Sequence, residues 1–170
     1  MSTATTPSPV ATGIDPRGPR VAATLTSVVL ALVLLTPSPV SAVLLTLQAA
    51  VFAVGATRGV HHTPYAVLFR RLVRPRLGPP AEPEDPRPPR FAQAVGLVFA
   101  MAGLVGFIAG SLVVALVASG LALVAALLNA TVGLCLGCEM YLILRRATAR
   151  RSSDPYEPAP GPGVQKGRTA

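Results

Sequence analysis

The chain has 170 residues, of which 51% are apolar and 13% charged, and its net charge is +8. A mean hydropathy of +0.56 is too high for an ordinary soluble domain and favours a membrane protein. The basic residues are not interleaved with exposed aromatics on a soluble module, so a nucleic-acid partner is excluded and a lipid bilayer is expected instead.

Residues 1–14 are rich in Ser, Thr, Pro and Ala and are expected to form a disordered tail. Arg17 and Arg20 follow, then an apolar run that ends in Pro39-Val40-Ser41-Ala42. This order resembles a secretory signal cleaved after Ala42. A second apolar run follows at once, and the same pattern returns later without such a site, so a retained membrane span is preferred.

Four apolar stretches come near the length that a membrane-spanning helix needs. They cover residues 21–36, 40–57, 91–109 and 111–130, and they hold no Asp, Glu, Lys or Arg. A helix needs about 20 apolar residues, with roughly 17 at the short end, to cross the hydrocarbon core. The sequence therefore predicts an all-α, polytopic membrane protein with four transmembrane helices.

The chain also contains an internal repeat. The pattern D-P-R-x-P-R opens at Asp15 and again at Asp85, 70 residues later. Each pair of spans is followed by Gly, then Tyr, then aliphatic residues and two arginines. This pattern predicts two parallel helical hairpin repeats, residues 15–74 and 85–146, joined by a Pro-rich linker at 75–84 and followed by a disordered tail at 147–170.

Each repeat is expected to end in a short helix that lies at the membrane surface. In the first repeat Thr63 is suited to cap such a helix and Pro64 to occupy its first position. Small residues recur in the later spans, at Gly103 and Gly106 and again at Ala115 and Ser119. They are expected to mark faces where helices approach closely.

The basic residues predict the orientation of the spans. All 15 lie in the two tails, in the segment between the second and third spans, or just after the fourth span. By the positive-inside rule, both termini and the Pro-rich linker lie in the cytoplasm. The expected location is a bacterial cytoplasmic membrane.

The candidate functional site is the segment GLCLGCEMYLILRR, which contains both cysteines of the chain, Cys135 and Cys138, followed by Glu139. One helix from Ser111 to the end of this segment would be far longer than the membrane is thick, so either a break near Gly133 or Gly137 or a long helix projecting into the cytoplasm is expected. A break would place the cysteines near a helix N-terminus, which favours a reactive thiolate. Cys135 and Cys138 are therefore candidate catalytic residues, with Cys135 the nucleophile and Cys138 the resolving thiol.

Two other interpretations of the cysteines remain open. They could be packing residues of a non-enzymatic membrane scaffold, since free Cys is often buried. They could also join His61 and His62, which hold the corresponding place in the first repeat, in a tetrahedral metal site. A permanent structural disulfide is disfavoured because the cytoplasm is reducing.

These motifs resemble an uncharacterised family of small bacterial membrane proteins, known as a domain of unknown function. The resemblance rests on GIDPRGPR, TPYAVLFRRLVRPRLGP, DPRPPRFAQAVG and the CLGCE motif. Members are similar in having four predicted spans and genes near those of thioredoxin-like and rhodanese-like sulfurtransferase proteins. The resemblance thus implies such a protein as partner in thiol redox or sulfur transfer.

The sequence predicts no cofactor and leaves a homo-oligomer open. It contains no P-loop, G-x-S-x-G or H-E-x-x-H motif. The main polar side chains within the spans are Gln48, Gln93 and Asn129. Asn129 lies close to the candidate site and is expected to form a hydrogen bond between helices rather than to bind substrate.

Overall fold

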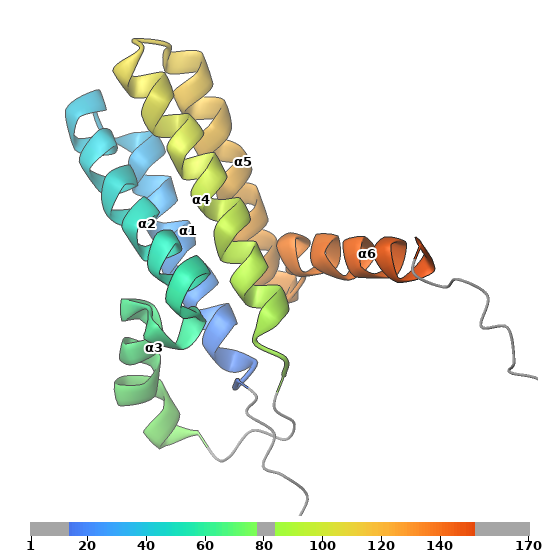
Figure 1. Cartoon of the computed structure of the whole chain (residues 1–170). Coiled ribbons are helices and arrows are strands. Elements are labelled where there is room, and N and C mark those ends of the chain that lie inside the picture. Colours follow the sequence, from blue (N-terminus) through green and yellow to red (C-terminus); the bar gives the residue numbers. More distant parts are fainter. Residues whose placement is uncertain (1–13, 78–83, 152–170) are drawn as a thin grey trace, which may run out of the picture.

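A computed structural model describes residues 14–77 and 84–151. Within these ranges the chain is helical and holds one isolated β-bridge but no strand. Residues 1–13, 78–83 and 152–170 lie outside the described residues, and with them most of the predicted tails and linker. The all-α prediction is confirmed (Figure 1).

Four long helices form a bundle: α1 (Arg17–Leu35), α2 (Ser38–Arg58), α4 (Arg87–Ile108) and α5 (Leu112–Val132). Each is long and apolar enough to cross a membrane, so the four predicted spans are confirmed. α1 and α4 begin before the predicted spans, within the two D-P-R-x-P-R motifs. Asp15 Oδ1 accepts the Arg17 N–H at 3.0 Å, and Asp85 Oδ1 accepts the Arg87 N–H at 2.9 Å.

The four helices are arranged in a ring around a common interior. α1 packs against α2 and α5, and α4 packs against the same two helices. Both hairpin turns lie at one end of the bundle, while α1 and α4 begin and α2 and α5 end at the other (Figure 1). This second end, called the basic end below, carries Arg17, Arg20, Arg58, Arg87 and Arg90.

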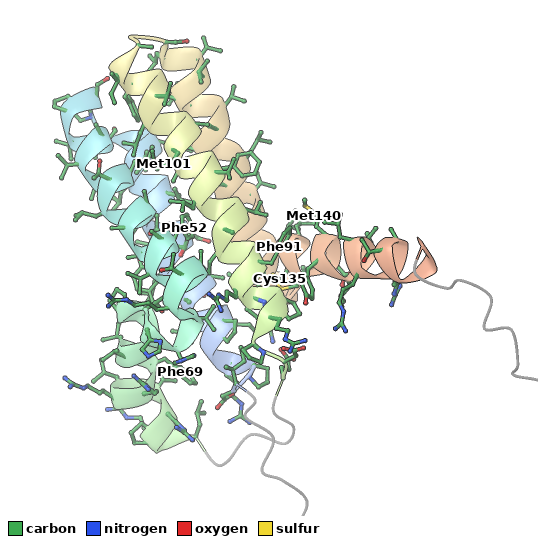
Figure 2. All side chains as sticks on the ribbon, viewed as in Figure 1. Phe52, Phe69, Phe91, Met101, Cys135 and Met140 are labelled. Atoms are coloured by element: carbon green, nitrogen blue, oxygen red, sulfur yellow. A yellow bond between two sulfur atoms is a disulfide. The ribbon has the colours of Figure 1, made fainter. Side chains whose placement is uncertain are left out.

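The interior is apolar and the outer surface is apolar as well. Leu30, Val33, Leu45 and Phe52 are buried in one core cluster with small residues of α4 and α5, and Phe52 lies inside the bundle in Figure 2. Long apolar side chains also point outward from every span, among them Val28, Leu47, Val98 and Val113. An apolar surface this extensive would cause aggregation in water, whereas lipid chains solvate it in a bilayer.

Small residues allow α4 and α5 to approach closely. A Cβ added at Gly106 would lie 2.5 Å from the Ala115 backbone nitrogen, and one at Gly103 would lie 3.1 Å from Ser119 Oγ. Ala115 and Ser119 are fully buried. The helix contact faces predicted from these residues are therefore confirmed.

The two hairpins make matching contacts at the basic end. Ile14 and Glu84, the residues before the two Asp-Pro-Arg motifs, exchange both backbone hydrogen bonds at 2.9 Å. Arg20 of the first hairpin donates to the Thr131 carbonyl near the end of α5 at 3.4 Å. Arg90 of the second hairpin donates to the Ala56 carbonyl near the end of α2 at 2.7 Å. Each hairpin thus supplies hydrogen bonds to carbonyls at the end of the other.

The segment after α2 consists of short helical turns. They are η1 (Val60–His62), α3 (Pro64–Leu68), the π-helical η2 (Phe69–Val73) and η3 (Arg74–Arg76). As predicted, Thr63 Oγ1 caps α3 by accepting the Ala66 N–H at 3.2 Å, and Pro64 is its first residue. α3 and η2 pack on α1, where Phe69 is buried.

A polar contact ties this segment to the bundle interior. The Tyr65 hydroxyl donates to Gln48 Oε1 at 2.8 Å, and Gln48 Nε2 donates to Thr26 Oγ1 at 3.4 Å. Burial raises the pKa of the Tyr65 hydroxyl, so it stays protonated and able to donate. Gln48 is fully buried, and these contacts link α1, α2 and α3.

Substitution of Gly106 tests the close approach of α4 and α5. We expect Gly106→Ala to lower the free energy of unfolding in detergent by about 1–3 kcal/mol, because the new methyl group meets the backbone of α5. Gly120→Ala is the control, since nothing lies within 4 Å of a Cβ at that position. Equal unfolding free energies for the two variants would contradict the packing described.

Candidate functional site

The last helix of the bundle ends at a glycine shortly before the cysteines. Gly133 has a φ of 75°, a left-handed conformation that glycine adopts without strain. The Leu134 N–H then donates to the Leu128 carbonyl at 3.3 Å, and α6 (Leu136–Arg151) begins after Cys135. The predicted break therefore occurs at Gly133, while Gly137 lies within α6.

α6 turns away from the direction of the spans and projects from one side of the bundle (Figure 1). It packs on α4, where a Cβ at Gly137 would lie 2.6 Å from Ala92 Cα. The rings of Phe91 and Tyr141 are 5.8 Å apart at the same contact. α6 continues to Arg151, past the predicted boundary at residue 146.

The two cysteines occupy the first turn of α6. Cys135 immediately precedes the helix, and its carbonyl accepts the Glu139 N–H at 3.0 Å. Its Sγ accepts the Cys138 N–H at 3.3 Å, so Cys135 holds the position and makes the contact of an N-cap residue. This N–H and the helix dipole both stabilise negative charge on the Cys135 sulfur.

The cysteines are joined by a disulfide in this structure, with their Cα atoms 5.2 Å apart. Figure 2 places Cys135 where α6 meets the bundle. Both residues are partly exposed, and the acidic Glu139 follows Cys138 in the first turn. A permanent disulfide is not expected in a reducing compartment. The geometry nevertheless allows the bond to form within the first turn of α6.

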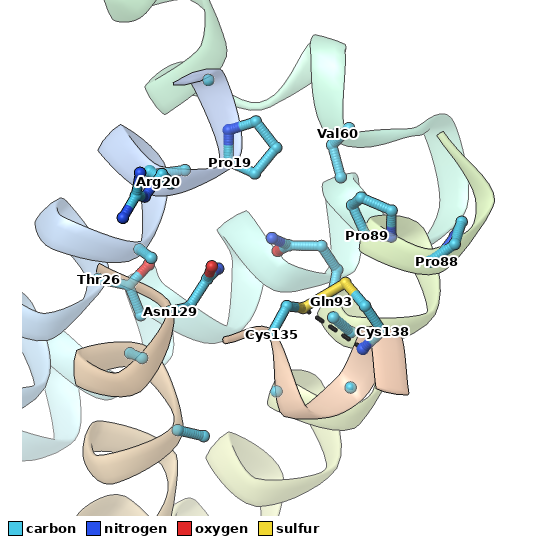
Figure 3. A pocket seen from close by; sticks show the side chains of 18 of the residues that line it. Pro19, Arg20, Thr26, Val60, Pro88, Pro89, Gln93, Asn129, Cys135 and Cys138 are labelled. Carbon is cyan, nitrogen blue, oxygen red and sulfur yellow. Dashed lines mark hydrogen bonds between the residues drawn. A yellow bond between two sulfur atoms is a disulfide. The ribbon is translucent and has the colours of Figure 1, made fainter. Parts of the chain in front are cut away.

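A cavity of about 1330 Å³ opens beside the disulfide at the basic end. It is lined by α1, α4, α5, the first turn of α6 and the α3 region. Figure 3 shows Gln93, Asn129 and Arg20 in the wall of the same cavity as the two sulfurs. Gln93 Oε1 is buried and has no hydrogen-bond partner in the described structure.

The comparisons with known proteins give a family and no activity. Residues 14–146 match a family described as Domain of unknown function (DUF4395). The chain belongs to the DUF4395 family. No curated protein and no solved structure matches it.

The DUF4395 region also contains His61 and His62, the other residues of the proposed metal set. Their rings are 4.1 Å apart, and His62 Nδ1 lies 2.8 Å from the Arg58 carbonyl oxygen. Burial, His62 and Arg70 lower the pKa of His61. His61 lines the same cavity as the cysteines, but in the described ranges no three His, Cys, Asp or Glu residues are grouped closely enough to hold a metal ion.

Gln93 and Arg20 of this DUF4395 protein lie in the wall of the cavity, although no sequence motif marks them as site residues. The sequence does contain an indication that Gln93 is special, because it is the single polar side chain between Arg90 and Gly110. Its closeness to the cysteines depends on how α6 folds back against α4, which the sequence pattern does not specify.

Substitution of Gly137 tests how the DUF4395 chain positions its cysteines. We expect Gly137→Val to push the first turn of α6 away from α4 and to change the alkylation rate of the reduced cysteines about tenfold, because the hydrogen bond to Cys135 Sγ and its surroundings depend on that turn. The measurement is the rate of reaction with iodoacetamide. Met140→Val is the control, since Met140 is exposed on the same helix; equal rates in both variants would contradict the proposed contact.

Proposed function

We propose that this protein is a membrane-embedded thiol redox protein, in which Cys135 and Cys138 alternate between a dithiol and a disulfide. The observation that carries the proposal is the hydrogen bond from the Cys138 N–H to Cys135 Sγ at 3.3 Å, at the start of a helix. This arrangement favours Cys135 as the thiolate and leaves Cys138 close enough to resolve a mixed disulfide.

The surroundings of the pair support exchange with another protein. Both cysteines are partly exposed, and α6 points away from the bundle (Figure 1). A partner could therefore approach the first turn of α6 without displacing a span. We propose a thioredoxin-like or rhodanese-like sulfurtransferase protein as that partner. Proteins of both classes carry a reactive cysteine that could exchange with the Cys135 and Cys138 pair.

We further propose that the protein lies in the bacterial cytoplasmic membrane with the basic end in the cytoplasm. The arginines at the ends of α1, α2 and α4 are gathered at that end, and the opposite hairpin turns carry no charged residue. The positive-inside rule assigns such an end to the cytoplasm. The cysteines then meet partners in the compartment that contains reduced thioredoxins.

The matching contacts of the two hairpins support duplication of one hairpin. The Ile14 and Glu84 bridge joins residues 70 positions apart, the same spacing that separates Asp15 from Asp85. Under duplication α1 corresponds to α4 and α2 to α5, and the pairs α1 with α5 and α4 with α2 become equivalent. The cysteine pair belongs to the second copy alone, which assigns the chemistry to residues 85–146.

Single-cysteine variants test the redox assignment. With Cys138→Ser, we expect Cys135 to form a stable mixed disulfide with an oxidised thioredoxin-like protein; with Cys135→Ser, we expect about tenfold less adduct, because the hydrogen-bonded thiolate is lost. The measurement is a mass shift on a non-reducing gel. The Cys135→Ser, Cys138→Ser double variant is the control, since the chain has no other cysteine.

Two outcomes of this experiment would contradict the redox proposal. One is adduct formation at the same low level in both single variants. The other is a wild-type pair that resists reduction by thioredoxin. Either outcome would favour the alternative in which the protein is a non-enzymatic membrane scaffold and its cysteines serve only as packing residues.

Thiol labelling tests the orientation independently. After reduction, a membrane-impermeant maleimide is expected to label Cys135 and Cys138 in inverted membrane vesicles and to leave them unlabelled in intact spheroplasts, because the basic end faces the cytoplasm. The double serine variant gives the background. Labelling in spheroplasts alone would reverse the assigned topology.

A further inference from the structure

The cavity beside the cysteines extends from the surface of the bundle into its membrane-spanning part. Thr26 of α1, Phe99 of α4 and Ala122 of α5 line its inner part. Ala122 is buried and lies 10 residues before the end of α5 at Val132, which is about 15 Å at the 1.5 Å rise of an α-helix. Half of the hydrocarbon core is about 15 Å thick, so the cavity reaches roughly to the middle of the membrane.

The lining separates into an apolar inner part and a polar outer part. Apolar residues such as Phe52, Phe99 and Ala122 line the inner walls, whereas Gln93, Asn129 and Arg20 line the part that holds the disulfide (Figure 3). A ligand that matches this division has a polar ring at the membrane surface and a hydrocarbon chain below it. Water-soluble thiols such as glutathione have no part that fits the inner walls.

Gln93 supplies a specific sign of a missing binding partner. Its Oε1 is buried without a hydrogen-bond partner, although a buried amide oxygen is costly to leave unpaired. The side chain is held against α2, where a Cβ added at Gly55 would lie 2.9 Å from the same oxygen. Gln93 also lines the cavity, so a rotation of its amide would turn this oxygen toward a ligand that can donate a hydrogen bond.

We infer that the cavity binds an isoprenoid quinone of the membrane, whose ring lies against Gln93 and oxidises the Cys135 and Cys138 dithiol. The inference rests on the proposed redox function and names its electron acceptor. A carboxamide suits both forms of such a ligand, because its N–H group donates to a quinone carbonyl and its oxygen accepts from a hydroquinone hydroxyl. Quinones also match the dithiol in taking up two electrons and two protons.

The reaction balances between the two partners. The Cys135 thiolate adds to the quinone ring, so that its electron pair becomes a carbon–sulfur bond and negative charge moves to a ring oxygen. The Cys138 thiolate then attacks the Cys135 sulfur, which forms the disulfide and breaks the carbon–sulfur bond, and the electron pair of that bond stays on the ring and completes its two-electron reduction. The two protons released by the thiols convert the reduced ring to hydroquinone, and the Arg20 guanidinium at the rim stabilises its negative charge before protonation.

Quinone binding is tested in the Cys135→Ser, Cys138→Ser background, where no redox reaction can occur. The probes are decylubiquinone and phylloquinone, a benzoquinone and a naphthoquinone, and the readout is the rise of the melting temperature in detergent. We expect at least one probe to raise it, and Gln93→Met to weaken the apparent affinity about tenfold, as loss of one hydrogen bond implies. Thr46→Val, a change on the exposed outer face of α2, should leave the affinity unchanged.

A second pair of variants tests the apolar part of the cavity. Ala125 lines the cavity, so Ala125→Phe should fill it and weaken binding at least about tenfold by overlap with the ligand. Leu127→Phe is the matched control, because Leu127 is exposed and lies about 200° around the same helix from Ala125. Occupation of the cavity by a phospholipid would not depend on Gln93. The inference is therefore overturned if Gln93→Met leaves the affinity for both quinones unchanged.

The oxidation step is measured separately with the reduced wild-type protein. We expect stoichiometric disulfide formation and loss of the quinone absorbance, with both slowed about tenfold in Gln93→Met. If neither quinone binds or oxidises the pair while exchange with thioredoxin proceeds, the quinone site is wrong and the redox function stands. If a quinone binds through Gln93 but neither the quinone nor thioredoxin reacts with the cysteines, the redox function and the oxidation step are both wrong.

Discussion

The backbone groups at the ends of spanning helices must find hydrogen-bond partners where water is scarce, and this constraint organises the basic end. The last carbonyls of α2 and α5 are met by guanidinium groups from the opposite hairpin, Arg90 and Arg20. An arginine can do this because its planar donors reach across the gap while its charge stays near the surface. The two hairpins are thereby joined at the level where α3 and α6 depart, and the site takes its position from that junction.

The sequence predicts the spans well because the signal is physical and local. Charge is absent over the whole length of each span, and a helix is the one open-ended structure that satisfies its own backbone in lipid. The contact faces at Gly106 and Ala115 follow from the same reasoning, since only small residues allow such an approach. The order of the helices around the ring and the reciprocal arginine contacts depend on long-range packing, which no local pattern specifies.

The site is predicted less completely. The spacing of Cys135 and Cys138 indicates a possible pair, and membrane thickness requires a break before them, although it does not choose between Gly133 and Gly137. The contact of Gly137 with Ala92 determines where the sulfurs lie, and Gln93 becomes their neighbour only through that contact. Metal binding by His61 and His62 was a reasonable alternative from position alone, and in the described ranges no ligand cluster is grouped around them.

The bridge between Ile14 and Glu84 has an evolutionary consequence. A pair of hydrogen bonds exchanged between equivalent positions is the signature of an isologous interface, in which each partner offers the other the same surface. Two separate chains, each with one hairpin, could close the same junction around a two-fold axis. Fusion of such a dimer would then allow the two halves to diverge, and in this molecule the second half carries the sulfur pair and the Gln93 carboxamide, where the first half has Ala23 at the position equivalent to Gln93.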